Sequence, residues 1–196
     1  MRAGLMLGVN NKAEREKHDF YATDPYAIDV ALETFRKIGL NNKVWECSCG
    51  KGHLSERLKS FGYNVFSSDL IDRKYGKQLD FLKTDRNIGQ GDIITNPPFS
   101  LAEDFVEHSM KILQEGQRAF FFLKIQFLET KGRKELFSKY PPEYVIINSE
   151  RICCAKDGEF EKYFKKKGNR YAGGTQFYAW FVFKKNYKGD TKVLWI

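Results

Sequence analysis

Apolar residues along this chain follow two periods, one typical of amphipathic helices and one typical of short buried strands. The helical period first appears after Asp24 and Pro25, which suit the N-cap and the first helical position, and Gly39 ends it. Strands and helices then alternate along most of the chain. Further helices are predicted at 54–61, 101–113 and 131–140, and strands at 43–47, 64–68, 92–95, 119–123, 143–148, 175–183 and 192–196, with a weaker strand near 78–82.

This alternation predicts an α/β fold, with a mostly parallel central sheet and helices on both of its faces. The late strands remain free to pair antiparallel. A length of 196 residues is that of one ordinary domain. We therefore expect a polar N-terminal arm over residues 1–18 and a single domain over residues 19–196, with a long, irregular basic loop at about 156–174.

Composition excludes several classes of protein. Hydrophobic residues make up 42% of the chain and charged residues 30%, which is typical of a globular protein. No stretch approaches the roughly 20 apolar residues that span a bilayer, and the N-terminus has too short an apolar run for a signal peptide, so we expect a cytoplasmic protein without a membrane partner. Cys47, Cys49, Cys153 and Cys154 lack the Cys-x2-Cys spacing of zinc sites, so no metal is expected. A monomer and a weak dimer both remain open.

The chain carries 33 Lys and Arg against 25 Asp and Glu, and this net charge of +8 suits a polyanionic partner such as nucleic acid. The same charge also serves solubility. Basic residues concentrate in two segments, 124–134 and 156–174. Both can contact phosphates, but the first can also be an ordinary amphipathic helix and the second a solvated loop. The candidate nucleic-acid contacts are Lys124 and Arg133 in the first segment and Lys165, Lys166, Lys167 and Arg170 in the second.

The segment from Val44 to Gly52 has the pattern of a strand that ends in Glu46 and turns through Gly50-Lys51-Gly52 into a helix. Glycines at such a turn allow a ligand to approach the backbone closely, although a tight turn can use glycine for its geometry alone. Asp69 ends the next strand, where a carboxylate can accept both hydroxyls of a ribose. The turn lacks the third glycine of the dinucleotide fingerprint, so a nucleoside ligand without a pyrophosphate fits better.

Asn96-Pro97-Pro98-Phe99 comes directly after the strand at 92–95 and is the most specific motif in the chain. The two prolines fix the backbone and remove two amide donors, so local carbonyl groups can accept hydrogen bonds from a ligand. A planar amino nitrogen that donates both hydrogens, to Asn96 Oδ1 and to the Pro97 carbonyl, is favoured in its pyramidal, nucleophilic form. Phe99 would stack on the base that carries this nitrogen. The pattern therefore indicates chemistry on an amino group rather than a plain Pro-Pro turn.

The combination of Glu-x-x-Cys-Gly-x-Gly at 46–52 with Asn-Pro-Pro-Phe resembles the S-adenosylmethionine-dependent amino-group methyltransferases, in particular the small phage-type DNA adenine-N6 methyltransferases. Asp19-Phe20-Tyr21-Ala22-Thr23 is similar to the motif before the glycine turn of that family, and the stretch from Gly173 to Phe183 is similar to its closing strand. The resemblance implies a Rossmann-like class I methyltransferase fold, S-adenosyl-L-methionine as cofactor, DNA as partner, and a bacterial or phage-infected cell as the setting. It implies cofactor binding by Phe20, Tyr21, Thr23, Glu46, Cys49, Gly50, Gly52, Asp69, Asp80 and Phe81, and amino-group chemistry at Asn96, Pro97, Pro98 and Phe99.

Other functions remain open beside DNA adenine methylation. The Asn-Pro-Pro motif serves planar amino nitrogens generally, so RNA or a protein glutamine is an alternative substrate. The chain could also be a nucleic-acid-binding protein on a methyltransferase fold with little activity, which would bind the cofactor without transferring its methyl group. The stretch between Gly52 and Asn96 has no room for an inserted recognition domain, so any sequence reading is expected from residues 124–142 and 156–174.

Overall fold

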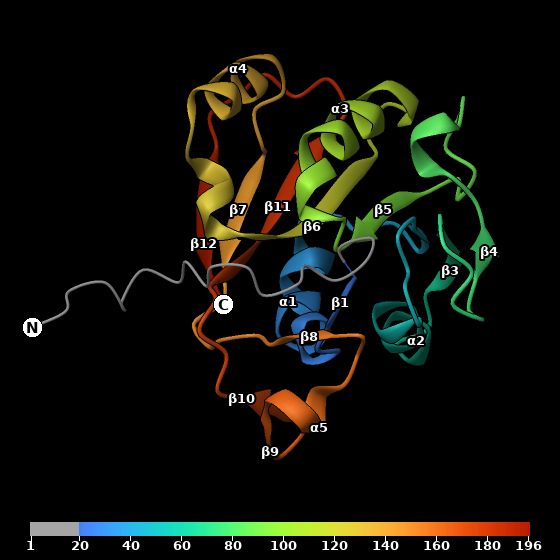
Figure 1. Ribbon diagram of the computed structural model, residues 1–196. Helices are drawn as coiled ribbons and strands as arrows, with labels where there is room; N and C mark the ends of the chain where they lie inside the picture. Colours follow the sequence, from blue (N-terminus) through green and yellow to red (C-terminus); the bar gives the residue numbers. More distant parts are fainter. Residues whose placement is uncertain (1–19) are drawn as a thin grey trace, which may run out of the picture.

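The computed structural model describes residues 20–196, and its centre is an eight-stranded sheet (Figure 1). Along the sheet the strands follow the order β12-β7-β11-β6-β5-β2-β3-β4. β11 runs antiparallel to both of its neighbours, and the other neighbouring strands are parallel to one another, which confirms the predicted α/β fold with a mostly parallel sheet. The strand bounds are β2 (Lys43–Glu46), β3 (Asn64–Asp69), β4 (Lys77–Gln78), β5 (Asp92–Thr95), β6 (Arg118–Lys124), β7 (Tyr144–Ile147), β11 (Tyr178–Lys184) and β12 (Lys192–Trp195).

Helices cover both faces of the sheet, as the sequence pattern predicts (Figure 1). Two helices pack on one face through side chains such as Phe35 and Leu58, and two pack on the other through side chains such as Phe105 and Leu136. The amphipathic period of each helix therefore corresponds to the one face that it buries. The first pair is α1 (Tyr26–Lys37) and α2 (His53–Ser60), and the second pair is α3 (Ala102–Ile112) and α4 (Lys131–Lys139).

The apolar run in β6 shows why the central strands carry no polar face. Phe120 and Phe122 point into the core beneath α1 and α2, whereas Phe121 points into the core beneath α3 and α4, and all three are fully buried. Successive side chains of a strand point to opposite faces, so a strand covered on both sides needs apolar residues at every position. Burial of both faces holds the central strands, and the positions of their ends, in place.

The weak strand expected near 78–82 is shorter than predicted. β4 covers only two residues, and the chain then turns through a 3-10 helix, η2 (Phe81–Lys83). Asp80 causes the turn, because its Oδ1 accepts a hydrogen bond from the backbone nitrogen of Leu82 at 3.1 Å. Phe81 is buried and contributes to the core beneath α3 rather than to a strand.

The basic segment at 156–174 is not an irregular loop. It forms a short helix and a two-stranded hairpin, which Figure 1 shows below the sheet. Phe160 stacks on Tyr171 with ring centroids 4.7 Å apart, so aromatic residues interleaved with lysines build a small core of their own. This segment comprises β8 (Cys154–Lys156), which pairs with β1 (Tyr21–Thr23), followed by α5 (Phe160–Tyr163), β9 (Lys165–Lys167) and β10 (Arg170–Ala172).

Asp24 fixes this segment to the rest of the domain. Its Oδ1 accepts from the backbone nitrogen of Tyr26 at 3.0 Å, which is the helix cap expected from the sequence, and its Oδ2 accepts from the backbone nitrogen of Tyr171 at 2.8 Å. One carboxylate therefore caps α1 and holds β10 against it. The expected arm at 1–18 lies outside the described residues.

None of the helices within residues 20–196 has the length and apolar character needed to cross a membrane.

Candidate functional site

A cavity of about 710 Å³ opens where the parallel strands β2, β3 and β5 have their carboxyl ends. Sheets of this kind bind ligands at that edge. The structure brings into this cavity every residue expected to bind the cofactor or act on an amino group, except the two glycines of the turn. The lining residues expected from the sequence are Phe20, Tyr21, Thr23, Glu46, Cys49, Asp69, Asp80, Phe81, Asn96, Pro97, Pro98 and Phe99.

Gly50 and Gly52 lie in the turn below the cavity, and both have positive φ angles, of 56° and 85°. A side chain on Gly50 would overlap the ring of Phe20, and one on Gly52 would overlap the ring of Tyr75. The space that the glycines leave open is therefore filled by aromatic rings of this chain. Glycine at these positions serves the turn geometry and the close packing of two rings.

The Asp69 carboxylate already accepts three hydrogen bonds. Its Oδ2 accepts from the Gly50 nitrogen at 2.8 Å, and its Oδ1 accepts from the Ile71 nitrogen at 2.9 Å and from Arg73 Nη1 at 2.8 Å. A carboxylate has about four acceptor positions, so one position remains on Oδ2. Asp69 can accept one ribose hydroxyl in this arrangement, and both only if Arg73 moves away.

Arg73 is a cavity residue that the sequence pattern did not indicate. Its guanidinium lies over the ring of Phe20, 4.3 Å from the ring centroid. The Arg73 side chain is mostly buried, like that of its ion-pair partner Asp69. Arg73 therefore contacts both Phe20 and Asp69, two residues that line the cavity.

Glu46 is the buried acid of the site. Its Oε2 accepts a hydrogen bond from the Ser55 hydroxyl, which also contacts the Ser67 hydroxyl at 2.6 Å. Burial disfavours the ionised form and raises the pKa of Glu46 to about 8. The carboxyl group is therefore mostly protonated at pH 7 and would ionise most readily beside a cationic ligand.

The Asn96 side chain is held by its nitrogen. Nδ2 donates to the backbone carbonyl of Tyr21 at 3.1 Å and to Thr23 Oγ1 at 2.9 Å, so β1 fixes the orientation of the amide. The assignment of nitrogen and oxygen follows from this network, because a backbone carbonyl can only accept. Asn96 Oδ1 is buried and has no hydrogen-bond partner among the described residues. An unpaired buried acceptor costs about 1–3 kcal/mol, so this oxygen is available for a donor on a ligand.

Ser48 connects the glycine turn to the Asn-Pro-Pro-Phe turn. Its hydroxyl contacts the Thr95 hydroxyl at 2.6 Å and donates to the backbone carbonyl of Asn96 at 3.1 Å. The sequence pattern did not indicate this residue, because a serine inside a glycine turn has no signal of its own. Its bonds hold the ends of β2 and β5 at a fixed separation.

Aromatic rings and one cation surround Phe99. The centroids of Tyr21 and Tyr178 lie 6.3 Å and 6.1 Å from the Phe99 centroid, and Lys124 Nζ lies 4.9 Å from it. Tyr178 was also missed, since it stands in an apolar run that predicts only a strand; its burial raises the pKa of its hydroxyl. This part of the site is suited to a planar ring with an anionic group nearby.

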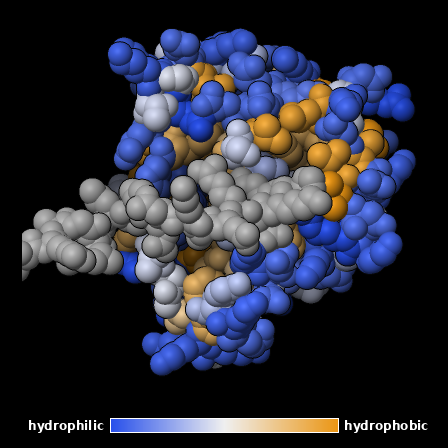
Figure 2. Space-filling model, in the orientation of Figure 1, coloured by the Kyte–Doolittle hydropathy of each residue, from blue (hydrophilic) through white to orange (hydrophobic). Residues whose placement is uncertain are grey.

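The expected nucleic-acid contacts do not form one cluster. Lys124 lies at the cavity, whereas Arg133 pairs with Glu103 and lies over the ring of Phe127 at 4.1 Å, and Arg170 pairs with Glu150 at 3.2 Å. The three lysines of β9, Lys165, Lys166 and Lys167, are exposed on the hairpin. Figure 2 shows predominantly hydrophilic residues over the lower lobe, where Figure 1 places that hairpin.

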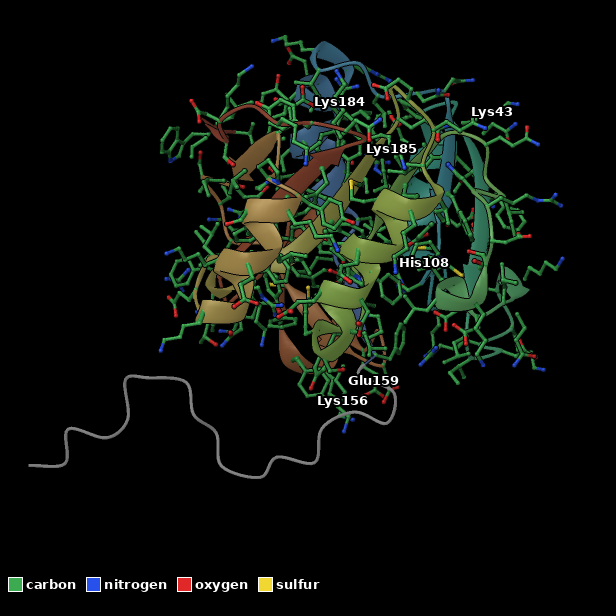
Figure 3. All side chains as sticks on the ribbon, turned by 90° about the horizontal axis from the view of Figure 1, so that it is seen from above. Lys43, His108, Lys156, Glu159, Lys184 and Lys185 are labelled. Atoms are coloured by element: carbon green, nitrogen blue, oxygen red, sulfur yellow. The ribbon has the colours of Figure 1, made fainter. Side chains whose placement is uncertain are left out.

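The cavity and the hairpin segment lie at the same end of the sheet. Figure 3 shows Lys156 and Glu159, which flank the β8–α5 turn, at one end of the molecule and Lys43 and Lys184 at the other. Lys43 begins β2 and Lys184 ends the antiparallel β11, so these two mark the edge opposite the carboxyl ends of the parallel strands.

Within residues 20–196, no three His, Cys, Asp or Glu side chains come together in a way that would hold a metal ion.

No protein-family model and no curated protein sequence matches this chain. Solved structures do share its fold. A protein of Listeria monocytogenes, assigned as a class I S-adenosylmethionine-dependent methyltransferase, matches with a TM-score of 0.55 and 16% identity over 91% of this chain and 65% of that chain. A Pyrococcus horikoshii protein assigned as an RNA methyltransferase matches with a TM-score of 0.57 and 13% identity over 86% and 87%. A Lactococcus lactis protein assigned as a hemolysin matches with a TM-score of 0.59 and 12% identity over 85% and 89%.

These likenesses confirm the Rossmann-like class I methyltransferase fold that the sequence predicts. The chain spans 65% of the length of the Listeria protein, and identities of 12–16% show the fold alone. The three proteins have been given different functions. The reaction and the substrate must therefore be argued from the residues of the site.

Proposed function

We propose that this chain is an S-adenosylmethionine-dependent methyltransferase that acts on the N6 amino group of adenine in DNA. The observation that carries the proposal is the buried Oδ1 of Asn96, which has no hydrogen-bond partner within residues 20–196, in a side chain whose nitrogen is held by Tyr21 and Thr23. A fixed acceptor of this kind is suited to an N–H donor. The resemblance of Asn-Pro-Pro-Phe to the motif of amino-group methyltransferases and the methyltransferase fold support the same reaction.

The residues that line the cavity fit the chemical groups of this cofactor. Asp69 has one free acceptor position for a ribose hydroxyl, and Glu46 can ionise to meet a cationic amino group. When bound, S-adenosylmethionine supplies a methyl group on a cationic sulfonium, which is a good electrophile. The chain therefore needs to orient the acceptor nitrogen rather than to provide a strong base.

Asn96 and the proline turn would activate the acceptor nitrogen. An exocyclic amino group is planar because its lone pair is delocalised into the ring. When its two hydrogens are donated to Asn96 Oδ1 and to the Pro97 carbonyl, the lone pair is localised and directed at the methyl group. Pro97 and Pro98 have no amide hydrogens, so neither adds a competing backbone donor at this turn.

The surroundings of Phe99 favour a nucleobase over a glutamine side chain. The ring is flanked by Tyr21, Tyr178 and the Lys124 ammonium, so a base can stack while its phosphate lies near a cation. A glutamine has neither a planar ring nor a phosphate. DNA is proposed over RNA on the family resemblance, and the exposed lysines of β9 would serve either polyanion.

The proposal is tested by incubating the purified chain with tritiated S-adenosylmethionine and, in parallel, unmethylated duplex DNA, single-stranded DNA, total RNA and a protein extract. Nucleoside analysis of the labelled fraction is expected to give N6-methyl-2′-deoxyadenosine. Label in RNA or protein would mean that the chain transfers a methyl group as proposed, but that its substrate is RNA or protein and not DNA. Cofactor binding without any label would instead favour a nucleic-acid-binding protein on this fold.

A further inference from the structure

A second aromatic and cationic site lies next in the chain to Tyr178, which contacts Phe99, on side chains that the proposed reaction does not use. The Phe177 side chain is 49% exposed, and the guanidinium of Arg151 lies 4.4 Å from the centroid of its ring. Arg151 Nη1 also donates to the backbone carbonyl of Gly174 at 3.1 Å, which holds the guanidinium in place. The ring and the cation together form a flat, exposed platform.

Backbone pairing places this platform next to the surroundings of Phe99. Phe177 directly precedes Tyr178, whose ring lies 6.1 Å from that of Phe99. The Phe177 carbonyl accepts a hydrogen bond from the Ile125 nitrogen at 3.0 Å, and the preceding Lys124 has its ammonium over Phe99. Phe177 is therefore one residue from Tyr178 and pairs with Ile125, one residue from Lys124, and both of these neighbours contact Phe99 of the cavity.

The charges around the platform indicate its partner. Within residues 20–196, Arg151 and Lys124 form no ion pair with a carboxylate, whereas Arg133 and Arg170 both do. An exposed ring would stack on a planar ligand, and two uncompensated cations beside it suit phosphates. A nucleotide supplies both groups, and an apolar peptide supplies neither.

We propose that Phe177 and Arg151 bind the nucleotide next to the target, by stacking its base on the Phe177 ring and pairing its phosphate with Arg151. This inference rests on the proposed function and adds the site that holds the flanking nucleotide. A base free to stack on a protein side chain must leave its neighbours in a duplex, so the platform favours a single strand or a locally opened duplex.

The chain contains a matched control for this platform. Phe61 is also an exposed phenylalanine, with the Arg57 guanidinium 4.6 Å from its ring centroid, but it lies at the end of α2 remote from the glycine turn. Phe177→Ala and Phe61→Ala therefore remove the same kind of ring from two places. Phe177→Trp keeps a stacking surface where Phe177→Ala removes it.

The test measures the affinity for a fluorescent single-stranded oligodeoxynucleotide by anisotropy, and the affinity for S-adenosylhomocysteine by calorimetry. Phe177→Ala is expected to weaken oligonucleotide binding about tenfold, Phe177→Trp to retain it, and Phe61→Ala to leave it unchanged. Cofactor affinity is expected to be the same in all three variants, which also shows that each has folded.

Two results would overturn the inference in distinguishable ways. If the unmodified chain binds and methylates DNA while Phe177→Ala binds the oligonucleotide equally well, the platform has no role and the proposed function stands. If the unmodified chain binds S-adenosylhomocysteine but no nucleic acid, the DNA substrate and the platform both fail.

Discussion

Asn96 donates through its nitrogen, and its oxygen has no hydrogen-bond partner within residues 20–196, so the proposed reaction depends on this acceptor together with the Pro97 carbonyl. Asn96→Ala is expected to lower kcat about 100- to 1000-fold, in the range found when one positioned hydrogen-bonding group is removed from a transition state. The dissociation constant for S-adenosylhomocysteine is expected to stay unchanged. Methylation assays and calorimetry on the same preparation give both values.

Thr23→Val provides the control for this prediction. It removes one of the two acceptors that hold Asn96 Nδ2 but leaves Oδ1 in place, so we expect a smaller loss of kcat than in Asn96→Ala. Normal turnover in Asn96→Ala would rule out the proposed activation of the amino group.

Glu46 should make cofactor binding depend on pH. Burial raises its pKa to about 8, so the ligand-free site is protonated below that pH, and a cationic amino group can be bound only with loss of the proton. The affinity for S-adenosylhomocysteine is therefore expected to increase about tenfold for each pH unit between 6 and 8 and to level off above pH 8. Calorimetry across this range measures the slope.

Glu46→Gln removes the titration and supplies the control. Its affinity is expected to be weak and nearly constant between pH 6 and 8. The pKa of the Glu46 carboxyl is raised from its ordinary value of 4.5 to about 8 in the folded protein, so its contribution to the free energy of unfolding falls as the pH rises from 4.5 to 8. Glu46→Gln should therefore raise Tm relative to the unmodified protein at pH 8. A pH-independent affinity in the unmodified protein would show that Glu46 does not meet a cation.

Arg73 occupies a position on Asp69 that a ribose hydroxyl of the proposed cofactor would use. Replacing it with Met removes the ion pair and frees an acceptor position on Asp69 Oδ1. We expect Arg73→Met to bind S-adenosylhomocysteine about fivefold more tightly than the unmodified protein, measured by calorimetry. Weaker binding would mean that Arg73 positions Asp69 rather than competing with the ligand.

Single residues also show where sequence reasoning succeeds and where it stops. Asp69 was identified because it ends a predicted strand, and Asn96 because it begins the Asn-Pro-Pro-Phe motif directly after another, and parallel strands bring their carboxyl ends together. Ser48 and Arg73 were not, because their contacts depend on the tertiary distance between two turns and on the rotamer of a long side chain. Neither quantity leaves a periodic signal in the sequence.

Glycines at the two ends of α2 allow the cost of backbone strain to be measured separately from the cost of steric overlap. Gly52 and Gly62 flank this helix with nearly equal φ angles of 85° and 87°, but only Gly52 faces a ring, that of Tyr75. Gly62→Ala is expected to lower the free energy of unfolding by about 1 kcal/mol through backbone strain alone. Gly52→Ala should lose more, about 2–3 kcal/mol, and should also weaken cofactor binding.

Urea denaturation of the two variants measures this difference. Equal losses would mean that Tyr75 moves aside without cost.

The β9–β10 hairpin should contribute to nucleic-acid affinity through charge. Lys165, Lys166 and Lys167 are exposed on β9 and present three successive like charges that a polyanion would relieve, whereas Arg170, opposite Lys167, is paired with Glu150. The double variant Lys166→Gln/Lys167→Gln is expected to weaken DNA binding and to reduce the slope of log K against log salt by about 1–2. Binding titrations at several salt concentrations measure that slope.

Lys43→Gln/Lys184→Gln is the matched control, because it removes the same charge from the opposite end of the sheet (Figure 3). Its slope is expected to equal that of the unmodified protein. If both double variants lose affinity equally, the hairpin makes no specific contact and only the net charge matters.

Helices and strands were predicted well where the apolar residues follow a single period, either helical or strand-like, and poorly where both periods overlap. α1 and β6 begin and end within a residue or two of their expected positions, because each has an uninterrupted pattern and a clear stop. The hairpin segment alternates lysine with aromatic residues, and its structure depends on Phe160 stacking on Tyr171 and on Asp24 far away in the chain. A local pattern could not show that.

For the whole molecule, the alternation of strands and helices was sufficient to predict the architecture but not the strand order. The position of β11 between β6 and β7 follows from pairing across long stretches of chain, which no local period encodes. The position of the cavity could be predicted, because a parallel sheet binds ligands at the carboxyl ends of its strands. That the hairpin lies at the same end of the sheet as the cavity could not be predicted.

The central position of β11 has a consequence for the chain as it is synthesised. β6 emerges from the ribosome long before β11, its antiparallel partner. The backbone of the Phe-rich strand β6 therefore has no partner on the β11 side until β11, which ends at Lys184, has also emerged. At ordinary rates of translation this interval lasts several seconds. An apolar edge exposed for that time can pair with another nascent chain. Slow codons between β6 and β11 should therefore lower the soluble yield of this protein.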